Sequence, residues 1–148
     1  MSTSFWVPGI PKPGGSKRGF YSAKLKRVII TDACKGNKDW KNSVSMNANS
    51  HFPNGPLQGP LEVHFEFHIP RPKGHFGKKG VRPSAPQYPA VRPDCTKLIR
   101  STEDALTGIA WDDDSQIVTQ LGTKRYSQKA GAQITVTCLT SDTEEAPW

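Results

Sequence analysis

The clearest alternation of apolar and polar residues in the chain lies between residues 61 and 69. A period of two places alternate side chains on opposite faces of a β-strand. The pattern therefore predicts a strand with one face on the core and the other toward solvent. The apolar members are Leu61, Val63, Phe65, Phe67 and Ile69.

A helical period follows in residues 37–49, where Trp40, Val44 and Ala48 recur at intervals of four. This spacing puts the three side chains on one face of an α-helix. We expect a helix here, with Trp40 in the core rather than serving as a stacking platform for bases.

A second helix is predicted from about Cys95 to Thr107, because its apolar and polar residues separate onto two sides at 100° per residue. The apolar side should anchor the helix on a sheet, so that the polar side is presented from a rigid element. The apolar side carries Leu98, Thr102, Ala105, Leu106 and Ile109, and the polar side Thr96, Arg100, Glu103, Asp104 and Thr107.

Other segments are less regular. A short first strand is expected from Phe5 to Ile10, a flexible basic loop from Lys12 to Gly19, a second strand from Ala23 to Ile30, and a further strand beginning at Ile117. Residues 71–93 lack apolar periodicity and are rich in proline and cations, which predicts a flexible basic loop that orders on DNA or a passive linker. We expect a loose C-terminal tail from about residue 141.

Length and composition support one small domain over residues 1–148. No run of 18 apolar residues and no secretory signal pattern occur, so we expect a cytoplasmic protein without a membrane partner. The three cysteines, Cys34, Cys95 and Cys138, are far apart and are expected to be reduced thiols.

Charge is distributed unevenly along the chain. The net charge is +7, yet residues 1–93 hold 15 Lys or Arg against 4 acids, and residues 94–114 hold 6 acids against 2 cations. The basic part predicts a polyanionic partner, either nucleic acid or an anionic membrane surface.

Two interpretations fit the acidic segment. It is either a solvated helix followed by an acidic turn, or a divalent-metal site in which the ion relieves repulsion between carboxylates. Asp94, directly before the second helix, also has the position of an ordinary N-cap residue. A basic surround with an acidic pocket is what a metal-dependent phosphodiesterase requires.

The residues around this segment resemble the signature of the RusA family of Holliday junction resolvases. In that family an R-x-D-x-D-N-L-x-K element is followed by D-A-L and then by D-D-x-Q-V-V. The matching block covers about 27 residues here. It comprises Arg92-Pro93-Asp94, Lys97-Leu98, Arg100, Asp104-Ala105-Leu106, Trp111 and Asp113-Asp114-Ser115-Gln116-Ile117-Val118.

The resemblance implies a small α+β fold, with a mixed β-sheet and two main helices packed on it. It also implies a homodimeric, Mg²⁺-dependent endonuclease (Mn²⁺ substituting) that resolves four-way DNA junctions by symmetric paired nicks in recombination and repair. It implies no small-molecule cofactor. Asp94, Asp113 and Asp114 would hold the metal, and Arg100, in place of the family lysine, would stabilise the transition state. Thr96 replaces the second acid of the D-x-D element, so either Asp112, Asp113 or Glu103 supplies the missing charge, or metal affinity and activity are lower.

DNA contacts are expected from cations near this block and in the basic loops. The expected DNA-binding residues are Lys12, Lys17, Arg18, Lys78, Lys79, Arg92 and Lys97.

An alternative function is a non-catalytic protein that binds junctions or structured nucleic acid through the same cations, with Thr96 marking a degenerate metal site.

Overall fold

The computed structural model describes residues 1–14, 17–32 and 36–139, and for residues 17–20 and 29–32 it describes the backbone alone. The expected tail from residue 141 and Cys34 lie outside the described residues. Cys95 and Cys138 are free cysteines, which agrees with the expected thiols.

Four strands form the central sheet in the order β1-β8-β4-β7. These strands are β1 (Ser2–Pro8), β8 (Gly131–Cys138), β4 (Leu61–Ile69) and β7 (Ile117–Tyr126). β8 pairs antiparallel with β1 and with β4, whereas β7 pairs parallel to β4. The sheet is therefore mixed, which confirms the predicted α+β class.

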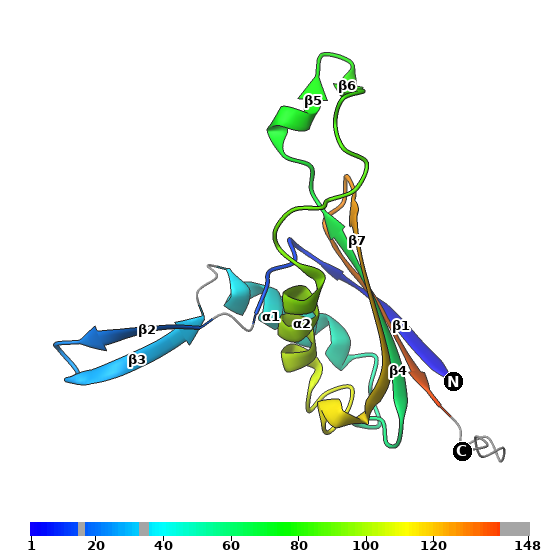
Figure 1. The fold of residues 1–148 in the computed structure, drawn as a ribbon. Helices are drawn as coiled ribbons and strands as arrows, with labels where there is room; N and C mark the ends of the chain where they lie inside the picture. Colours follow the sequence, from blue (N-terminus) through cyan, green and yellow to red (C-terminus); the bar gives the residue numbers. More distant parts are fainter. Residues whose placement is uncertain (15–16, 33–35, 140–148) are drawn as a thin grey trace, which may run out of the picture.

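Two helices, α1 (Asn37–Asn49) and α2 (Cys95–Leu106), cover one face of this sheet (Figure 1). Trp40 on α1 is 2% exposed and its Nε1 donates a hydrogen bond to Thr102 Oγ1 of α2 at 3.2 Å. Both predicted helices and the core position of Trp40 are confirmed. No helix in the described part of the chain is long and apolar enough to cross a membrane.

A hairpin of β2 (Lys17–Ser22) and β3 (Arg27–Asp32) stands away from the body (Figure 1). The predicted strand from Ala23 to Ile30 was wrong at its start, because residues 23–26 form the turn. Lys26 there has a positive φ of 52°, and Leu25 N donates to Ser22 Oγ at 3.3 Å. The predicted loop from Lys12 to Gly19 was also too long, since β2 begins at Lys17.

Residues 71–93 contain only a short 3₁₀ turn, η1 (Lys73–His75), and the two-residue strands β5 (Phe76–Gly77) and β6 (Gly80–Val81). Arg71 fastens this segment, because its Nη1 donates to Pro86 O at 2.8 Å and its guanidinium lies 4.4 Å from the centre of the Tyr126 ring. The predicted lack of regular structure holds apart from this small hairpin.

Candidate active site

The start of α2 is fixed by Asp94, whose Oδ2 accepts a hydrogen bond from Lys97 N at 3.1 Å. Asp94 therefore has the N-cap role that its position predicted. Its side chain is exposed, and it also lines a cavity. The structural role and a role in chemistry are compatible, because the cap uses one carboxylate oxygen.

The cavity beside Asp94 has a volume of about 540 Å³ and is lined by three cations, Lys12, Arg92 and Lys97. These come from the segment after β1, from the end of the basic loop and from the first turn of α2. Three positive charges around one concave surface suit a phosphate group. The remaining walls are Ile10, Pro11, Pro13, Ile69, Pro70 and Pro93.

Hydrogen bonds hold in place the backbone segments that form the walls of this cavity. Ser101 Oγ donates to Lys12 O at 2.5 Å, and Gly14 N donates to Lys97 O at 2.8 Å. Lys124 Nζ of β7 donates to Val91 O at 2.8 Å and to Pro93 O at 2.9 Å. The end of the basic loop is thus tied to the sheet beside α2.

Glu103 and Asp114 form an acidic pair near the end of α2. Burial raises the pKa of the Glu103 carboxyl to about 7, and the negative charges of Asp114 and then Asp104 add to the effect. The Gln120 amide, which donates a hydrogen bond to Glu103 Oε1, and the Arg100 guanidinium act in the opposite direction. The surroundings of Glu103 therefore disfavour its negative charge.

The acidic run is ordered by a 3₁₀ turn, η2 (Asp114–Gln116). Asp113 caps this turn, with Oδ1 accepting from Ser115 N at 2.8 Å, and this backbone hydrogen bond lowers the pKa of the exposed Asp113 carboxyl. Gln116 Nε2 donates to Leu57 O at 2.9 Å, which ties the turn to the segment before β4. The carboxylate of Asp114 is therefore held on a braced turn.

Asp94 and Asp114, which were expected to hold one metal site together, are separated by the length of α2. Glu103 follows Asp94 by nine residues, which corresponds to about 13 Å along a helix axis. Figure 1 shows η2, in yellow, at the opposite end of α2 from its start. Among the described residues, no three His, Cys, Asp or Glu side chains gather into a group able to hold a metal ion.

The residue types present at Glu103 and Asp114 nevertheless fit a hard divalent cation. Carboxylate oxygens are the ligands that Mg²⁺ and Mn²⁺ prefer, and a cation would relieve the repulsion that raises the Glu103 pKa. Arg100 lies one helical turn before Glu103, close enough to influence its pKa. Thr96, which replaces the family acid, is exposed on the first turn of α2.

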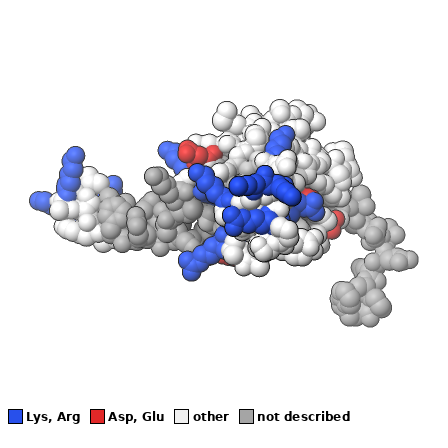
Figure 2. Space-filling view, turned by 90° about the horizontal axis from the view of Figure 1, so that it is seen from above, with Lys and Arg blue, Asp and Glu red and all other residues white. Residues whose placement is uncertain are grey.

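The predicted DNA-binding residues fall into three places. Lys12, Arg92 and Lys97 meet at the cavity, while Lys78 and Lys79 lie exposed between β5 and β6. Figure 2, seen from above the view of Figure 1, shows Lys and Arg side chains gathered in the middle of that face, with few Asp or Glu side chains among them. The side chains of Lys17 and Arg18, on β2, lie outside the described residues.

Sequence reasoning missed Gln120 and Lys124, which brace the two parts of the site from β7. These two residues reach the site because β7 packs against α2. The packing is closest at Gly122, where an added Cβ would lie 2.6 Å from Ile99 Cδ1 and 3.8 Å from Cys95 Cβ. Neighbouring even-numbered residues of β7 therefore face α2, which the amino-acid pattern alone does not reveal.

Comparisons with known proteins identify the family to which the chain is similar. The family described as "Endodeoxyribonuclease RusA" matches residues 8–137. The chain is also similar to the "Uncharacterized protein YqaN" of Bacillus subtilis (strain 168), with 28% identity over 135 residues. That match covers 89% of this chain and 93% of the relative.

Proposed function

We propose that this chain, which belongs to the endodeoxyribonuclease RusA family, is a divalent-metal-dependent endonuclease that resolves four-way DNA junctions by symmetric paired nicks. The family assignment supports a nuclease. The junction as substrate, the metal requirement, a homodimeric state, a place in recombination and repair, and a cytoplasmic location are parts of our proposal.

One observation carries the proposal: α2 connects a basic cavity at its start with an acidic pair near its end. The cavity holds Asp94 among Lys12, Arg92 and Lys97, and the pair is Glu103 with Asp114. A nuclease needs cations to bind phosphates and carboxylates to hold a metal ion. Here α2 carries one member of each part, Lys97 of the cavity and Glu103 of the acidic pair.

Glu103 and Asp114 are the residues we assign as the main metal ligands, with Glu103 supplying the charge that Thr96 lacks. Asp113, beside Asp114, would complete this set, whereas Asp94, at the other end of α2, is too far away to bind the same ion and would act in the basic cavity. When bound, Mg²⁺ or Mn²⁺ would neutralise negative charge on the phosphate and lower the pKa of a water molecule. The chain itself would supply the remaining interactions.

Arg100 has a fixed positive charge on the same helix face, and we assign it to stabilise the negative charge that develops on the attacked phosphate. A guanidinium cannot exchange a proton near neutral pH, so Arg100 would act by charge and not as an acid. Lys12, Arg92 and Lys97 would hold a neighbouring phosphate and orient the strand, while Lys78 and Lys79 would contact DNA farther away.

A homodimer follows from the product that we propose. Two symmetric nicks in opposing strands require two sites related by a two-fold axis, and a pair of identical subunits provides them. Each subunit would then cut one strand of the junction.

The alternative is a junction-binding protein without catalysis. Thr96 in place of an acid and the separation of Asp94 from Asp114 favour it, whereas the raised pKa of Glu103 favours the enzyme. The alternative keeps the basic cavity and its affinity for phosphates but has no metal chemistry.

The test is a synthetic four-way junction labelled on each strand in turn, with a linear duplex of the same sequence as the control. We expect paired nicks at symmetry-related positions in the junction with Mg²⁺, and none in EDTA or in the duplex. Tight binding to the junction without nicks under Mg²⁺ or Mn²⁺ would establish the binding protein instead.

A further inference from the structure

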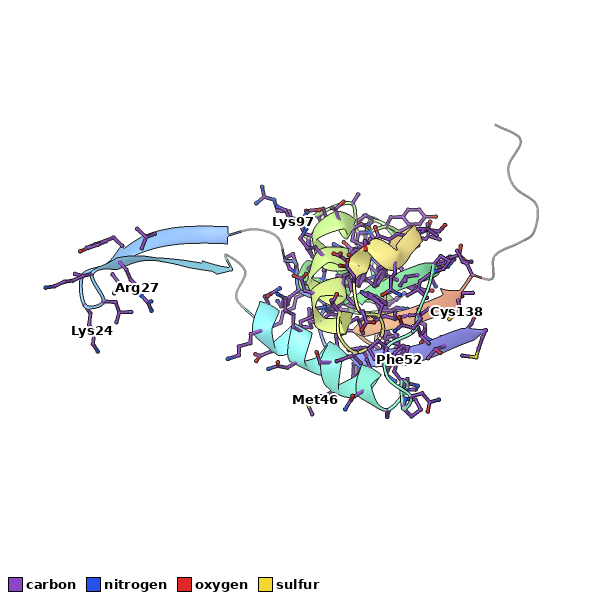
Figure 3. The ribbon with its side chains drawn as sticks, turned by 90° about the horizontal axis from the view of Figure 1, so that it is seen from below. Lys24, Arg27, Met46, Phe52, Lys97 and Cys138 are labelled. Carbon is purple, nitrogen blue, oxygen red and sulfur yellow. The ribbon has the colours of Figure 1, made fainter. Side chains whose placement is uncertain are left out.

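The hairpin of β2 and β3 carries a strongly basic tip. Residues 21–28, whose side chains are described, contain three cations, Lys24, Lys26 and Arg27, and no acid. All three are exposed, and Figure 3 shows Lys24 and Arg27 on the hairpin well away from the helices and sheet. The charge of this tip is complementary to a polyanion.

The hairpin also exposes apolar side chains. Tyr21 and Val28 face each other across the strand register and are each 65% exposed, and Leu25 in the turn is 51% exposed. A two-stranded hairpin standing alone in water is marginally stable. An exposed ribbon with both charge and apolar surface is therefore suited to a binding partner.

The hairpin is connected to the body beside the basic cavity. On the entry side, Lys12 and Pro13 line the cavity, and on the exit side Asn37 Nδ2 donates to Pro13 O at 2.7 Å. A Cβ on Gly36 would lie 3.4 Å from Lys12 Cε. The chain thus leaves and rejoins the body at the same wall of the cavity.

The length of its strands sets how far the hairpin extends from the body. Each strand has six residues, so the tip lies about 20 Å beyond the base at roughly 3.3 Å per residue. The rise of a duplex is about 3.4 Å per base pair, so this reach equals about six base pairs. The major groove is about 12 Å wide and admits a two-stranded ribbon.

We propose that the β2–β3 hairpin is a DNA-binding ribbon that enters a groove of a duplex arm and contacts phosphates at least about six base pairs from the phosphate in the cavity. This inference rests on the proposed function insofar as DNA is the ligand of the cavity. The hairpin would contribute affinity and not chemistry, because the carboxylates of the site lie on α2 and η2.

The experiment measures binding of a labelled junction in EDTA over a range of salt concentrations, using the full chain with Lys24→Ala and Arg27→Ala together. Loss of two phosphate contacts should lower the slope of log affinity against log salt by about 2 and weaken binding about tenfold or more at 0.1 M salt. The matched control, Arg125→Gln with Lys129→Gln, removes two charges from elsewhere and should change the slope little.

Further variants separate charge from folding. Lys24→Arg with Arg27→Lys keeps both charges and should bind like the wild type. Shortening the duplex arms to fewer than about six base pairs should weaken the wild type but not the Ala variant. An unchanged slope in the Ala variant would overturn the proposal. A change in subunit assembly with unchanged DNA affinity would also overturn it and would place the hairpin in a protein interface.

The binding experiment tests the hairpin separately from the proposed endonuclease activity. If the hairpin variant loses affinity but the wild type never nicks, the endonuclease proposal fails and the ribbon stands. If nicking occurs and the hairpin variant binds normally, the ribbon proposal fails alone.

Discussion

The carboxyl groups of Glu103 and Asp114 lie close enough to interact electrostatically, although 11 positions separate them in the sequence. Burial and the charge of Asp114 together raise the Glu103 pKa to about 7. This pairing gives the chain two neighbouring acids in spite of Thr96, and it locates the compensating charge near the end of α2.

Replacing Glu103 by Gln should alter the pH dependence of stability in the metal-free protein. The pKa of Glu103 is about 7 in the folded state against an ordinary 4.5, so folding favours the protonated form. The stabilising contribution is complete below about 4.5 and is lost as pH rises through 7. In EDTA, Glu103→Gln should therefore melt a few degrees above the wild type at pH 8.

The same variant supplies its own control at low pH. Near pH 4.5 and below, the melting temperatures of the wild type and Glu103→Gln should coincide, because both side chains are then neutral in the folded protein. A constant difference at all pH values would show that the substitution acts through packing and not through charge.

Thr96→Asp should leave the Mg²⁺ concentration needed for half-maximal nicking unchanged. The new carboxylate would lie in the first turn of α2, seven residues before Glu103, which is about 10 Å along the helix axis and too far to share the ion of Glu103 and Asp114. The matched control is Thr96→Asn, which adds no charge. A several-fold lower Mg²⁺ requirement in Thr96→Asp would indicate that the start of α2 also holds a metal ion.

Asp94 allows its structural role to be separated from its proposed chemical role. Asn is as good an N-cap as Asp, so Asp94→Asn should keep the melting temperature, whereas Asp94→Ala should lose about 1 kcal/mol of stability. Both should lose nicking if the carboxylate charge is required. Full nicking by a stable Asp94→Asn protein would assign Asp94 to capping alone.

Gly131→Ala should destabilise the pairing of β8 with β1. The added Cβ would overlap the backbone carbonyl oxygen of Val7 and the Trp6 ring, and relieving this overlap should cost about 1–3 kcal/mol because backbone has to shift. Chemical denaturation measures the loss. Gly74→Ala is the control, because nothing lies within 4 Å of its Cβ and the variant should be nearly neutral.

The elements with strong periodicity could be predicted from the sequence. Trp40, Val44 and Ala48 located α1, and the alternation from residue 61 to 69 located β4, because burial of one face imposes these periods. β8 was not identified, although Ala132, Ile134 and Val136 alternate into the core. β8 carries three apolar residues at this spacing against five in β4, and one of them is the small Ala132, so its signal is weaker.

The candidate site was only partly predictable. Asp94 was recognised as an N-cap because that role is local, and Glu103 was named as one candidate for the missing charge. Its pairing with Asp114 depends on how the turn after α2 folds back, which periodicity does not encode. The contribution of Lys124 likewise depends on the register of β7 against α2.

The central claim is that Glu103 and Asp114 hold the cation needed to cut the junction. The most direct measurement is single-turnover nicking of a four-way junction against Mg²⁺ concentration in Glu103→Gln, Asp114→Asn and Asp112→Asn. Asp112→Asn is the matched control, since Asp112 contacts Gln58 and is not among the proposed ligands. We predict a loss of roughly a hundredfold or more in the first two variants and wild-type nicking in the control. Wild-type rates in Asp114→Asn, or equal losses in all three variants, would contradict the account.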